Sequence, residues 1–417
     1  MGKITSVDRR NLIKWGLLSS GLPLLTKGSF FASSASPAQT VGTADNELYE
    51  GKNLPGGAQV DPRLMISPFS TDADIVDAAH RMSPFNPESW HVEWKRLAEK
   101  NERSAEEFEK EGLIVTANGF YQRSAHFYQE AVIYLPESDS RMMPTFNKML
   151  DMYKRAWQLV PPAFERVEVP YEGTTLPGFF SKPRGNPGQR FPSVYAFGGA
   201  DPVLFSARYA TESATYNARG MAYLHVDGPG QGVPLRLKHV YAPPDSERVA
   251  KAVLDYLVAR SDVDPDRIGI SGASMGGYTA PRMASGEKRI KAAVFFAGAY
   301  SLREDIFDYF PPIQERLRWL MGAKDLGDAR RKIADFTLEG RTNQIECPML
   351  IGYSKDDRIM DPRGAFRLYQ AATGSKREML EGVGHDSGRL LPSMRTRAPR
   401  EILFADWMAK HLVGTRS

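Results

Sequence analysis

From about Phe164 onwards the sequence alternates between short apolar runs and helix-like stretches, and this alternation constrains the fold more than any other feature. The apolar runs have the length of buried strands, and segments with helical periodicity separate most of them. Alternating strands and helices predict an α/β fold, in which a mostly parallel sheet has helices on both faces. Strands are expected at residues 166–171, 176–181, 193–197, 222–226, 268–271, 292–296, 349–352 and 377–380, and helices at 206–219, 246–260, 278–284 and 398–411.

Two segments fall outside this alternation. Residues 72–160 carry apolar side chains at helical spacing, and Asn86-Pro87 is typical of a helix start. Such a block needs a partner that covers its apolar stripes. Residues 302–341 are charged and helical in pattern, and they lie between two expected strands. We therefore expect this second segment to lie outside the sheet.

A Gly-x-Ser-x-Gly pentapeptide at residues 272–276 stands between an expected strand and an expected helix. This strand–turn–helix context is the one that a nucleophile elbow requires, and small residues are needed because the turn is tight. The turn would expose the Ser274 hydroxyl at a helix N-terminus, where the positive end of the dipole favours an oxyanion. The alternative is a glycine-rich turn with a buried serine. We predict that Ser274 is a nucleophile.

A serine hydroxyl needs a base, and the base needs an acid that orients it. In the α/β-hydrolase fold the acid and then the histidine follow the serine along the chain. Asp357 and His385 keep that order, each in the loop after one of the last two expected strands. The adjacent Asp356 is the alternative acid. Asp357 is favoured because the run Asp-Arg-Ile-Met-Asp-Pro that it begins looks like the D-x-I-V-x-P loop of these hydrolases.

The oxyanion hole is expected to use two backbone N–H groups. One belongs to Met275, directly after the predicted nucleophile. The other follows the strand at 193–197, where Gly198-Gly199-Ala200 makes a turn that the substrate can approach closely. This second donor stays open between Gly199 and Ala200, and the simpler interpretation is a turn that only ends a strand.

One further motif narrows the family. Asp227-Gly-Pro-Gly-Gln-Gly232 follows an expected strand, after the Gly-Gly turn and before the Gly-x-Ser-x-Gly motif. A D-x-P-G-x-G element in that place resembles α/β-hydrolases of the 2,6-dihydropseudooxynicotine hydrolase type. The fungal pigment-shortening hydrolases and the bacterial FrsA-like proteins are similar. The resemblance covers about Trp90 to the C-terminus, and Asp227 itself is expected to cap a turn.

The resemblance implies an α/β-hydrolase fold with a helical cap, in which Ser274, Asp357 and His385 form the triad. Known members cleave C–C bonds in β-diketone-like compounds, or esters, so a small-molecule substrate is expected. A C–C hydrolase must also stabilise a carbanion leaving group. Glu304 and Asp305 are candidates to position or protonate it, although solvated acids at a helix start are the favoured interpretation.

Other functions stay open beside a C–C hydrolase. A plain carboxylesterase would use the same residues. A peptidase of the prolyl-oligopeptidase kind shares the core, but no propeller repeat precedes it here. A non-catalytic binding protein on this fold is opposed by a serine, an acid and a histidine in the correct order.

Charge gives no support to nucleic-acid binding. The 417 residues include 54 Lys and Arg against 50 Asp and Glu, and five of these basic residues but only one acidic residue lie within residues 1–38. The rest of the chain is therefore neutral. The single cysteine, Cys347, excludes an intramolecular disulfide, and no Cys/His cluster has zinc spacing. We expect no metal, no cofactor and no nucleic-acid partner, and a homodimer is left open.

The first forty residues have the layout of an export signal. Arg9-Arg10 precede two apolar residues and a lysine, which resembles the twin-arginine motif. The apolar run at 15–25 is too short to cross a ~30 Å hydrocarbon core comfortably, and the small residues at 32–38 suit signal peptidase. The alternative is an uncleaved amphipathic helix. The resemblance implies export of a folded enzyme by the twin-arginine machinery to the periplasm or beyond, with no membrane span in the mature form.

These observations together predict a division of the chain into five parts. They are a signal peptide at 1–38, a lead segment and helical cap at 39–160, the first part of the hydrolase core at 161–300, a helical cap insertion at 301–345, and the second part of the core at 346–417.

Overall fold

The structure, a computed structural model, describes most of the chain that follows residue 72. The described residues are 73–83, 86–200, 207–382, 384–385, 389–391, 396–398 and 400–414. All of them belong to one unit, Leu48–Ser417. The predicted signal peptide and lead segment lie outside the described residues. Within these residues, no helix combines the length and the apolar character needed to cross a membrane.

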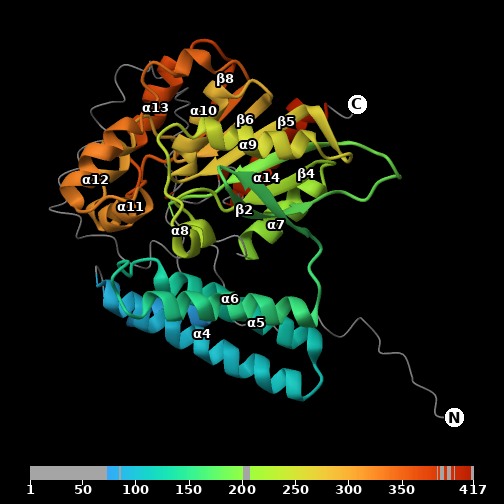
Figure 1. The fold of residues 1–417 in the computed structure, drawn as a ribbon, viewed down its shortest axis with the longest axis vertical. Helices are drawn as coiled ribbons and strands as arrows, with labels where there is room; N and C mark the ends of the chain where they lie inside the picture. Colours follow the sequence, from blue (N-terminus) through green and yellow to red (C-terminus); the bar gives the residue numbers. More distant parts are fainter. Residues whose placement is uncertain are drawn as a thin grey trace, which may run out of the picture. The chain divides into compact units, whose positions relative to one another are not determined.

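An eight-stranded sheet in the order β1-β2-β4-β3-β5-β6-β7-β8 forms the centre of the fold (Figure 1). β2 pairs antiparallel with both β1 and β4, and every later pair is parallel. This confirms the predicted α/β architecture with a mostly parallel sheet. The strands are β1 (Glu165–Tyr171), β2 (Thr174–Ser181), β3 (Phe191–Phe197), β4 (Ala222–Val226), β5 (Val263–Ala273), β6 (Ile290–Phe296), β7 (Met349–Tyr353) and β8 (Arg377–Glu381).

Helices cover both faces of this sheet. Every residue of β3, β4 and β7 is buried, as expected for strands that have helices on each side. α9 (Glu247–Val258) packs against α10 (Gly276–Gly286), whereas α7 (Ala207–Asn217) packs against α14 (Arg400–Leu412). Figure 1 shows the sheet between these two pairs of helices.

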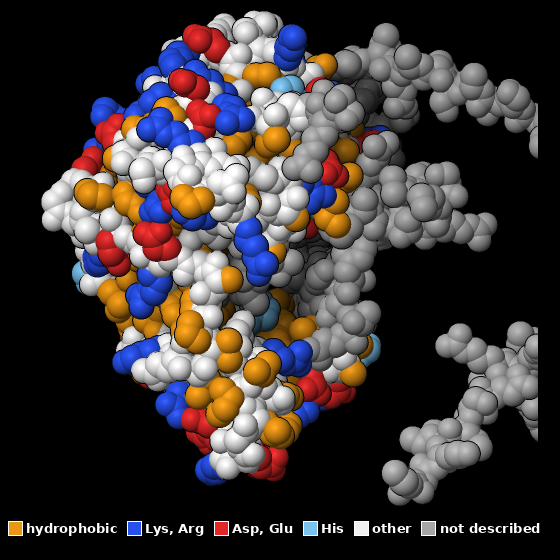
Figure 2. Space-filling view, turned by 90° about the vertical axis from the view of Figure 1, so that its right-hand side faces the viewer, with side chains coloured by type: hydrophobic (Ala, Val, Ile, Leu, Met, Phe, Trp, Pro, Cys, Tyr) orange, Lys and Arg blue, Asp and Glu red, His pale blue; other side chains and the backbone are white. Residues whose placement is uncertain are grey.

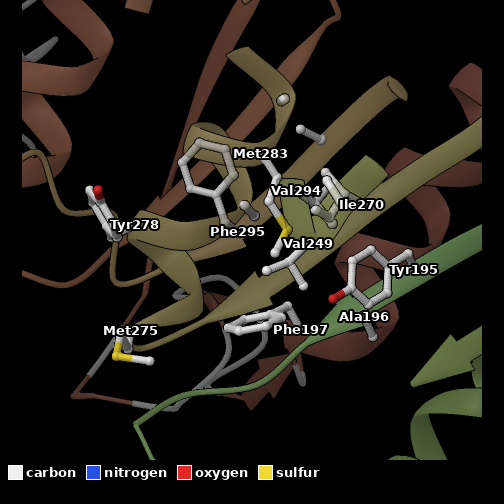
Figure 3. Close-up of a cluster of buried hydrophobic side chains, with 14 of the residues drawn as sticks. Tyr195, Ala196, Phe197, Val249, Ile270, Met275, Tyr278, Met283, Val294 and Phe295 are labelled. Atoms are coloured by element: carbon white, nitrogen blue, oxygen red, sulfur yellow. The ribbon is translucent and has the colours of Figure 1, made fainter. Parts of the chain in front are cut away.

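The core beside the predicted elbow is apolar and closely filled. In Figure 3, Phe197 of β3, Ile270 of β5 and Val294 of β6 lie beside Val249 of α9 and Met283 of α10. All five side chains are buried. Because closely packed side chains resist displacement, this cluster fixes the strands that lead into the elbow and the helix that leaves it.

The segment before the sheet is a block of helices with its own apolar core. Trp90 and Trp94 pack there at spacing four, in contact with each other and, for Trp94, with Phe127. The predicted helix start is confirmed, because the Asn86 side chain accepts hydrogen bonds from the N–H groups of Glu88 and Ser89. The helices are α3 (Ala73–Arg81), α4 (Pro87–Lys110), α5 (Ile114–Val132) and α6 (Met142–Leu159).

The segment between β6 and β7 lies outside the sheet, as predicted, but its helices are short. They are the π-helical turn η2 (Arg303–Phe307), α11 (Gln314–Leu320) and α12 (Leu326–Lys332), with single 3₁₀ turns between and after them. The buried Arg316 of α11 donates hydrogen bonds to the carbonyl oxygens of Val132 and Ile133. The insertion and the helical block are therefore joined directly.

Three described elements were not expected from the sequence pattern. They are α8 (Gly232–Lys238), α13 (Pro362–Ala371) and the hairpin of β9 (Arg389–Leu391) and β10 (Thr396–Ala398). α13 carried a readable signal, since Asp361 caps it and Pro362 occupies its first turn.

Charged side chains of both signs are intermixed over the face drawn in Figure 2, which shows no extended area of one sign. This distribution agrees with the neutral charge balance of the chain after residue 38.

Candidate active site

The predicted nucleophile lies in a sharp turn between β5 and α10. Ser274 has a φ of 58°, in the left-handed region that residues with a side chain rarely adopt. Glycines make room for the turn: a methyl group on Gly272 would lie 2.2 Å from the Gly276 carbonyl oxygen, and one on Gly276 would lie 2.7 Å from the Phe197 carbonyl oxygen. The Gly-x-Ser-x-Gly spacing is thus a steric requirement of this turn.

Ser274, His385 and Asp357 form one continuous chain of hydrogen bonds. His385 Nε2 lies 2.9 Å from Ser274 Oγ, and His385 Nδ1 lies 3.0 and 2.9 Å from the two carboxylate oxygens of Asp357. The Asp357 carboxylate is buried, and its Oδ1 also accepts hydrogen bonds from the N–H groups of Ile359 and Met360. These bonds hold the carboxylate toward the imidazole.

The two adjacent acids of this loop have different partners. Both carboxylate oxygens of Asp357 contact the imidazole, whereas Asp356 Oδ1 accepts a hydrogen bond of 2.8 Å from the N–H of Gly384. It therefore ties the acid loop to the residue before His385. Tyr309, from the insertion, donates its hydroxyl to the carbonyl oxygen of Asp357 and fixes the loop from the other side.

Two of the three residues predicted for the oxyanion hole, Met275 and Gly199, lie next to Ser274. Met275 is buried and stands directly before the first residue of α10. Gly199, in the turn after β3, packs against the serine, because a methyl group on it would lie 3.0 Å from Ser274 Cβ and 3.4 Å from Ser274 Oγ. Ala200 follows in the same turn and is also buried. Met275 and Gly199 thus adjoin the elbow, and the oxyanion role of all three residues stays a prediction.

The D-x-P-G-x-G loop after β4 supports this turn. Asp227 is fully buried, and its Oδ2 accepts a hydrogen bond from the N–H of Val233, which matches the expected turn-capping role. Gln231, which the sequence reasoning did not single out, is fully buried as well and binds the backbone of Gly198 and Gly199. Gln231 lies within the D-x-P-G-x-G motif that indicated the family.

The two acids considered for a leaving group have structural partners. Glu304 is half exposed and pairs with Arg367, as expected for a solvated acid. Asp305 is fully buried, so the expectation of a solvated acid is wrong for it. Its carboxylate accepts hydrogen bonds from the N–H groups of Tyr300 and Ser301 and also pairs with Arg367. Burial raises the pKa of Asp305 to about 6, although Arg367 opposes this shift.

No rival chemistry is apparent among the described residues. Cys347 is buried, and burial raises the pKa of its thiol to about 12, which makes it a poor nucleophile. No group of three or more His, Cys, Asp or Glu side chains within the described ranges is arranged to hold a metal ion.

Two family models match the sequence of this chain. A family model described as esterase FrsA-like matches residues 59–305, which is more than half of the chain. The chain belongs to the FrsA-like esterase family. A model of the prolyl oligopeptidase family also matches this FrsA-like protein, at residues 208–415. Both families are hydrolases, so the predicted enzyme class is confirmed together with the α/β-hydrolase fold.

Fungal α/β-hydrolases are among the curated relatives of this FrsA-like protein. The α/β-hydrolase gkaG of Penicillium citrinum is 33% identical over 77% of this chain and 84% of its own length. The α/β-hydrolase xenA of Xenoacremonium sinensis is 34% identical over 58% of this chain, and the match spans 59% of that relative's length. Among solved structures, 2,6-dihydroxy-pseudo-oxynicotine hydrolase has a TM-score of 0.67 at 24% identity, covering 84% of this chain and 95% of its own. This last likeness supports the fold.

Proposed function

We propose that the protein is a serine hydrolase that cleaves a small carbonyl compound through an acyl-enzyme, with Ser274, His385 and Asp357 as its catalytic triad. The observation that carries the proposal is the unbroken hydrogen-bond chain from Ser274 Oγ through both nitrogens of His385 to the buried Asp357 carboxylate. A nucleophile, a base and an orienting acid in this geometry are the minimum that acyl transfer requires.

The first half of the reaction forms the acyl-enzyme. Ser274 Oγ attacks the substrate carbonyl while His385 Nε2 takes the hydroxyl proton, and Asp357 stabilises the imidazolium at Nδ1. The negative oxygen of the tetrahedral intermediate is bound by the N–H of Met275 and a second N–H from Gly199 or Ala200. The bond to the leaving group then breaks, and His385 returns the proton to the leaving atom.

The second half releases the acid product. A water molecule attacks the acyl-enzyme carbonyl while His385 takes one of its protons, and the ester bond to Ser274 breaks as the serine oxygen regains a proton from His385.

In a β-diketone-like substrate the leaving group of the first half is an enolate, whose charge is already delocalised onto the second carbonyl. Protonation by His385 alone then completes the cleavage of the C–C bond.

The preferred substrate is a β-diketone-like compound, and a small ester is the second candidate. The likeness in fold to 2,6-dihydroxy-pseudo-oxynicotine hydrolase and the resemblance carried by the D-x-P-G-x-G loop support the first. The esterase description of the matching family model supports the second. The match to the prolyl oligopeptidase family keeps a peptidase as a further alternative. We also propose export by the twin-arginine route, on the resemblance of residues 1–38.

The proposal is tested by Ser274→Ala in purified protein. Short p-nitrophenyl esters and β-diketones are compared as substrates, with identification of the products. We expect the variant to lose on the order of 10³-fold or more in turnover while its circular dichroism is unchanged, since only one oxygen is removed. Ser285→Ala is the matched control, because this buried serine of α10 only donates its hydroxyl to the Arg282 carbonyl oxygen. Activity of Ser274→Ala at a tenth of the original would end the assignment.

A further inference from the structure

One buried side chain connects the D-x-P-G-x-G loop to the turn that carries the predicted oxyanion donors. Gln231 is fully buried. Its Oε1 accepts a hydrogen bond of 3.0 Å from the N–H of Gly228, within its own loop. Its Nε2 donates to the carbonyl oxygens of Gly199 at 2.9 Å and Gly198 at 3.3 Å. Both ends of the carboxamide are thus engaged, and the donor end holds the turn after β3.

That turn lies directly on the nucleophile elbow. A methyl group added to Gly199 would lie 3.0 Å from Ser274 Cβ, and one added to Gly276 would lie 2.9 Å from the Gly198 carbonyl oxygen. The two peptide units that Gln231 holds are therefore within van der Waals contact of the elbow. A rotation of either unit would alter the surroundings of Ser274 directly.

Because a peptide unit is planar, hydrogen bonds that fix its carbonyl oxygen also fix the direction of its N–H group. The described residues contain no cis peptide bond, and in a trans peptide the C=O and the N–H point in opposite directions. With the carbonyls of Gly198 and Gly199 directed at Gln231 Nε2, the N–H groups of Gly199 and Ala200 point away from Gln231. These two N–H groups are the candidates for the second oxyanion donor.

We propose that Gln231 is a positioning residue of the oxyanion hole: its carboxamide fixes the two peptide units whose N–H groups stabilise the tetrahedral intermediate formed at Ser274. This inference rests on the proposed function, because it assumes that Ser274 is the nucleophile. Gln231 does not touch the reacting atoms. It acts by removing the freedom of the Gly-Gly turn, which has no side chains of its own to hold it.

The chemistry of the contact requires an amide at this position. A glutamate has the same shape but cannot donate to a carbonyl while ionised, and its charge would repel both carbonyl oxygens. A methionine fills a similar volume but has no N–H group that could donate to the two carbonyl oxygens. A buried carbonyl that loses its partner turns toward another donor where one is in reach, because an unpaired buried acceptor is costly. Either substitution should therefore release the turn from its present orientation.

The test measures the rate at which a fluorophosphonate probe labels the serine, because this reagent needs no knowledge of the substrate. Gln231→Met is compared with the unaltered protein, with Gln231→Glu as the second variant. We expect labelling to slow by about 10- to 100-fold, approaching the loss caused by removal of one oxyanion donor. The final labelled fraction should stay complete. The pH dependence of labelling should keep its midpoint, since His385 and Asp357 are untouched.

The controls separate this role from a structural one. Asn101→Asp alters another buried amide, which donates to the Leu97 carbonyl oxygen within the helical block, and it should label at the original rate. If Gln231 only stabilised the fold, its variants would lower the labelled fraction and leave the rate of the folded molecules within twofold of the original. That result overturns the inference. If Gln231→Met does not fold, the same criterion applies to Gln231→Glu, and failure of both to give any folded protein also counts against a positioning role.

The experiment also separates this inference from the proposed function. Ser274→Ala is labelled in parallel, and it should show no labelling. Labelling of Ser274→Ala at the original rate would refute the nucleophile itself. No labelling of Ser274→Ala together with a normal rate in Gln231→Met would refute the role of Gln231 alone.

Discussion

Backbone strain at a single residue sets the geometry of the site. Among the described residues, Ser274 is one of four with a side chain and a positive φ. The turn around it is held by hydrogen bonds from the Ser274 N–H to the Phe296 carbonyl oxygen and from the Gly277 N–H to the Ser274 carbonyl oxygen. A strained residue persists only where its surroundings determine its conformation. Here strands β5 and β6 and helix α10 do so, and they present the hydroxyl to His385.

The two adjacent acids give a prediction at this scale. We expect Asp357→Asn to lower kcat by about 10⁴-fold, because an amide in contact with His385 Nδ1 favours the wrong tautomer and cannot stabilise the imidazolium. Asp356→Asn is the matched control: its side-chain oxygen can still accept the hydrogen bond from Gly384 N–H, so activity should stay within a few-fold. Steady-state kinetics on a p-nitrophenyl ester decide between them. A crippled Asp356→Asn beside an active Asp357→Asn would reverse the assignment of the acid.

The sequence indicated the three residues of the hydrogen-bond chain but not the residue that holds the turn. Ser274, Asp357 and His385 follow from motif, order and loop context, which are local properties. The contact of Gln231 with Gly198 and Gly199 depends on how two loops more than thirty residues apart meet in space. No local pattern encodes that meeting, although the D-x-P-G-x-G motif marked the loop.

At the scale of elements, the strands of the sheet were predicted from the sequence, whereas the short helices were not. All eight strands of the sheet lie at expected positions. Buried strands such as β7 show as continuous apolar runs, and β1 shows as an alternation of exposed and buried residues. Helices α8, α11 and α12 have seven residues each, which is too few turns for a 3.6-residue period to be distinguished. The same limit explains Asp305, whose burial depends on how the π-helical turn η2 is folded inward.

Helix α5 contains a histidine that should make the helical block sensitive to acid. Burial lowers the pKa of His126 to about 4 from an ordinary value of 6.5, and the positive charge of Arg123 acts in the same direction. Between these two pH values the unfolded chain binds a proton that the folded chain excludes. The free energy of unfolding is therefore not reduced by this residue above about pH 6.5, and it decreases as the pH falls toward 4.

This sensitivity is tested by the midpoint of thermal unfolding, followed by circular dichroism at pH 7 and pH 5. We expect the original protein to lose more stability between these conditions than His126→Leu does, because the variant cannot be protonated there. His80→Leu is the control, since His80 is exposed on α3. An equal loss of stability in the original protein and in His126→Leu would contradict the prediction.

At the scale of the whole described molecule, the helical block, the insertion and the sheet domain are joined through one cluster of aromatic and cationic side chains. Arg236 of α8 lies over the rings of Phe146 in α6 and Trp319 in α11. Arg316 of α11 also lies over the ring of Trp319. Guanidinium groups stack well on aromatic faces while they keep hydrogen-bonding capacity. The D-x-P-G-x-G loop leads directly into α8, so the loop that holds the oxyanion turn is also attached to both helical segments.

The last prediction concerns the destination of the molecule. We expect the double variant Arg9→Lys with Arg10→Lys to be fully active but retained in the cytoplasm. The paired arginines resemble an export signal that a receptor reads, and they precede the described fold, so catalysis should not depend on them. Both substitutions keep the positive charge, and a purely electrostatic attachment to a membrane would therefore survive them. Cell fractionation with an activity assay on each fraction distinguishes the two cases. Unchanged recovery from the periplasm would mean that residues 1–38 are not a twin-arginine signal. If the export receptor recognises the arginine pair specifically, activity is found only in the cytoplasmic fraction.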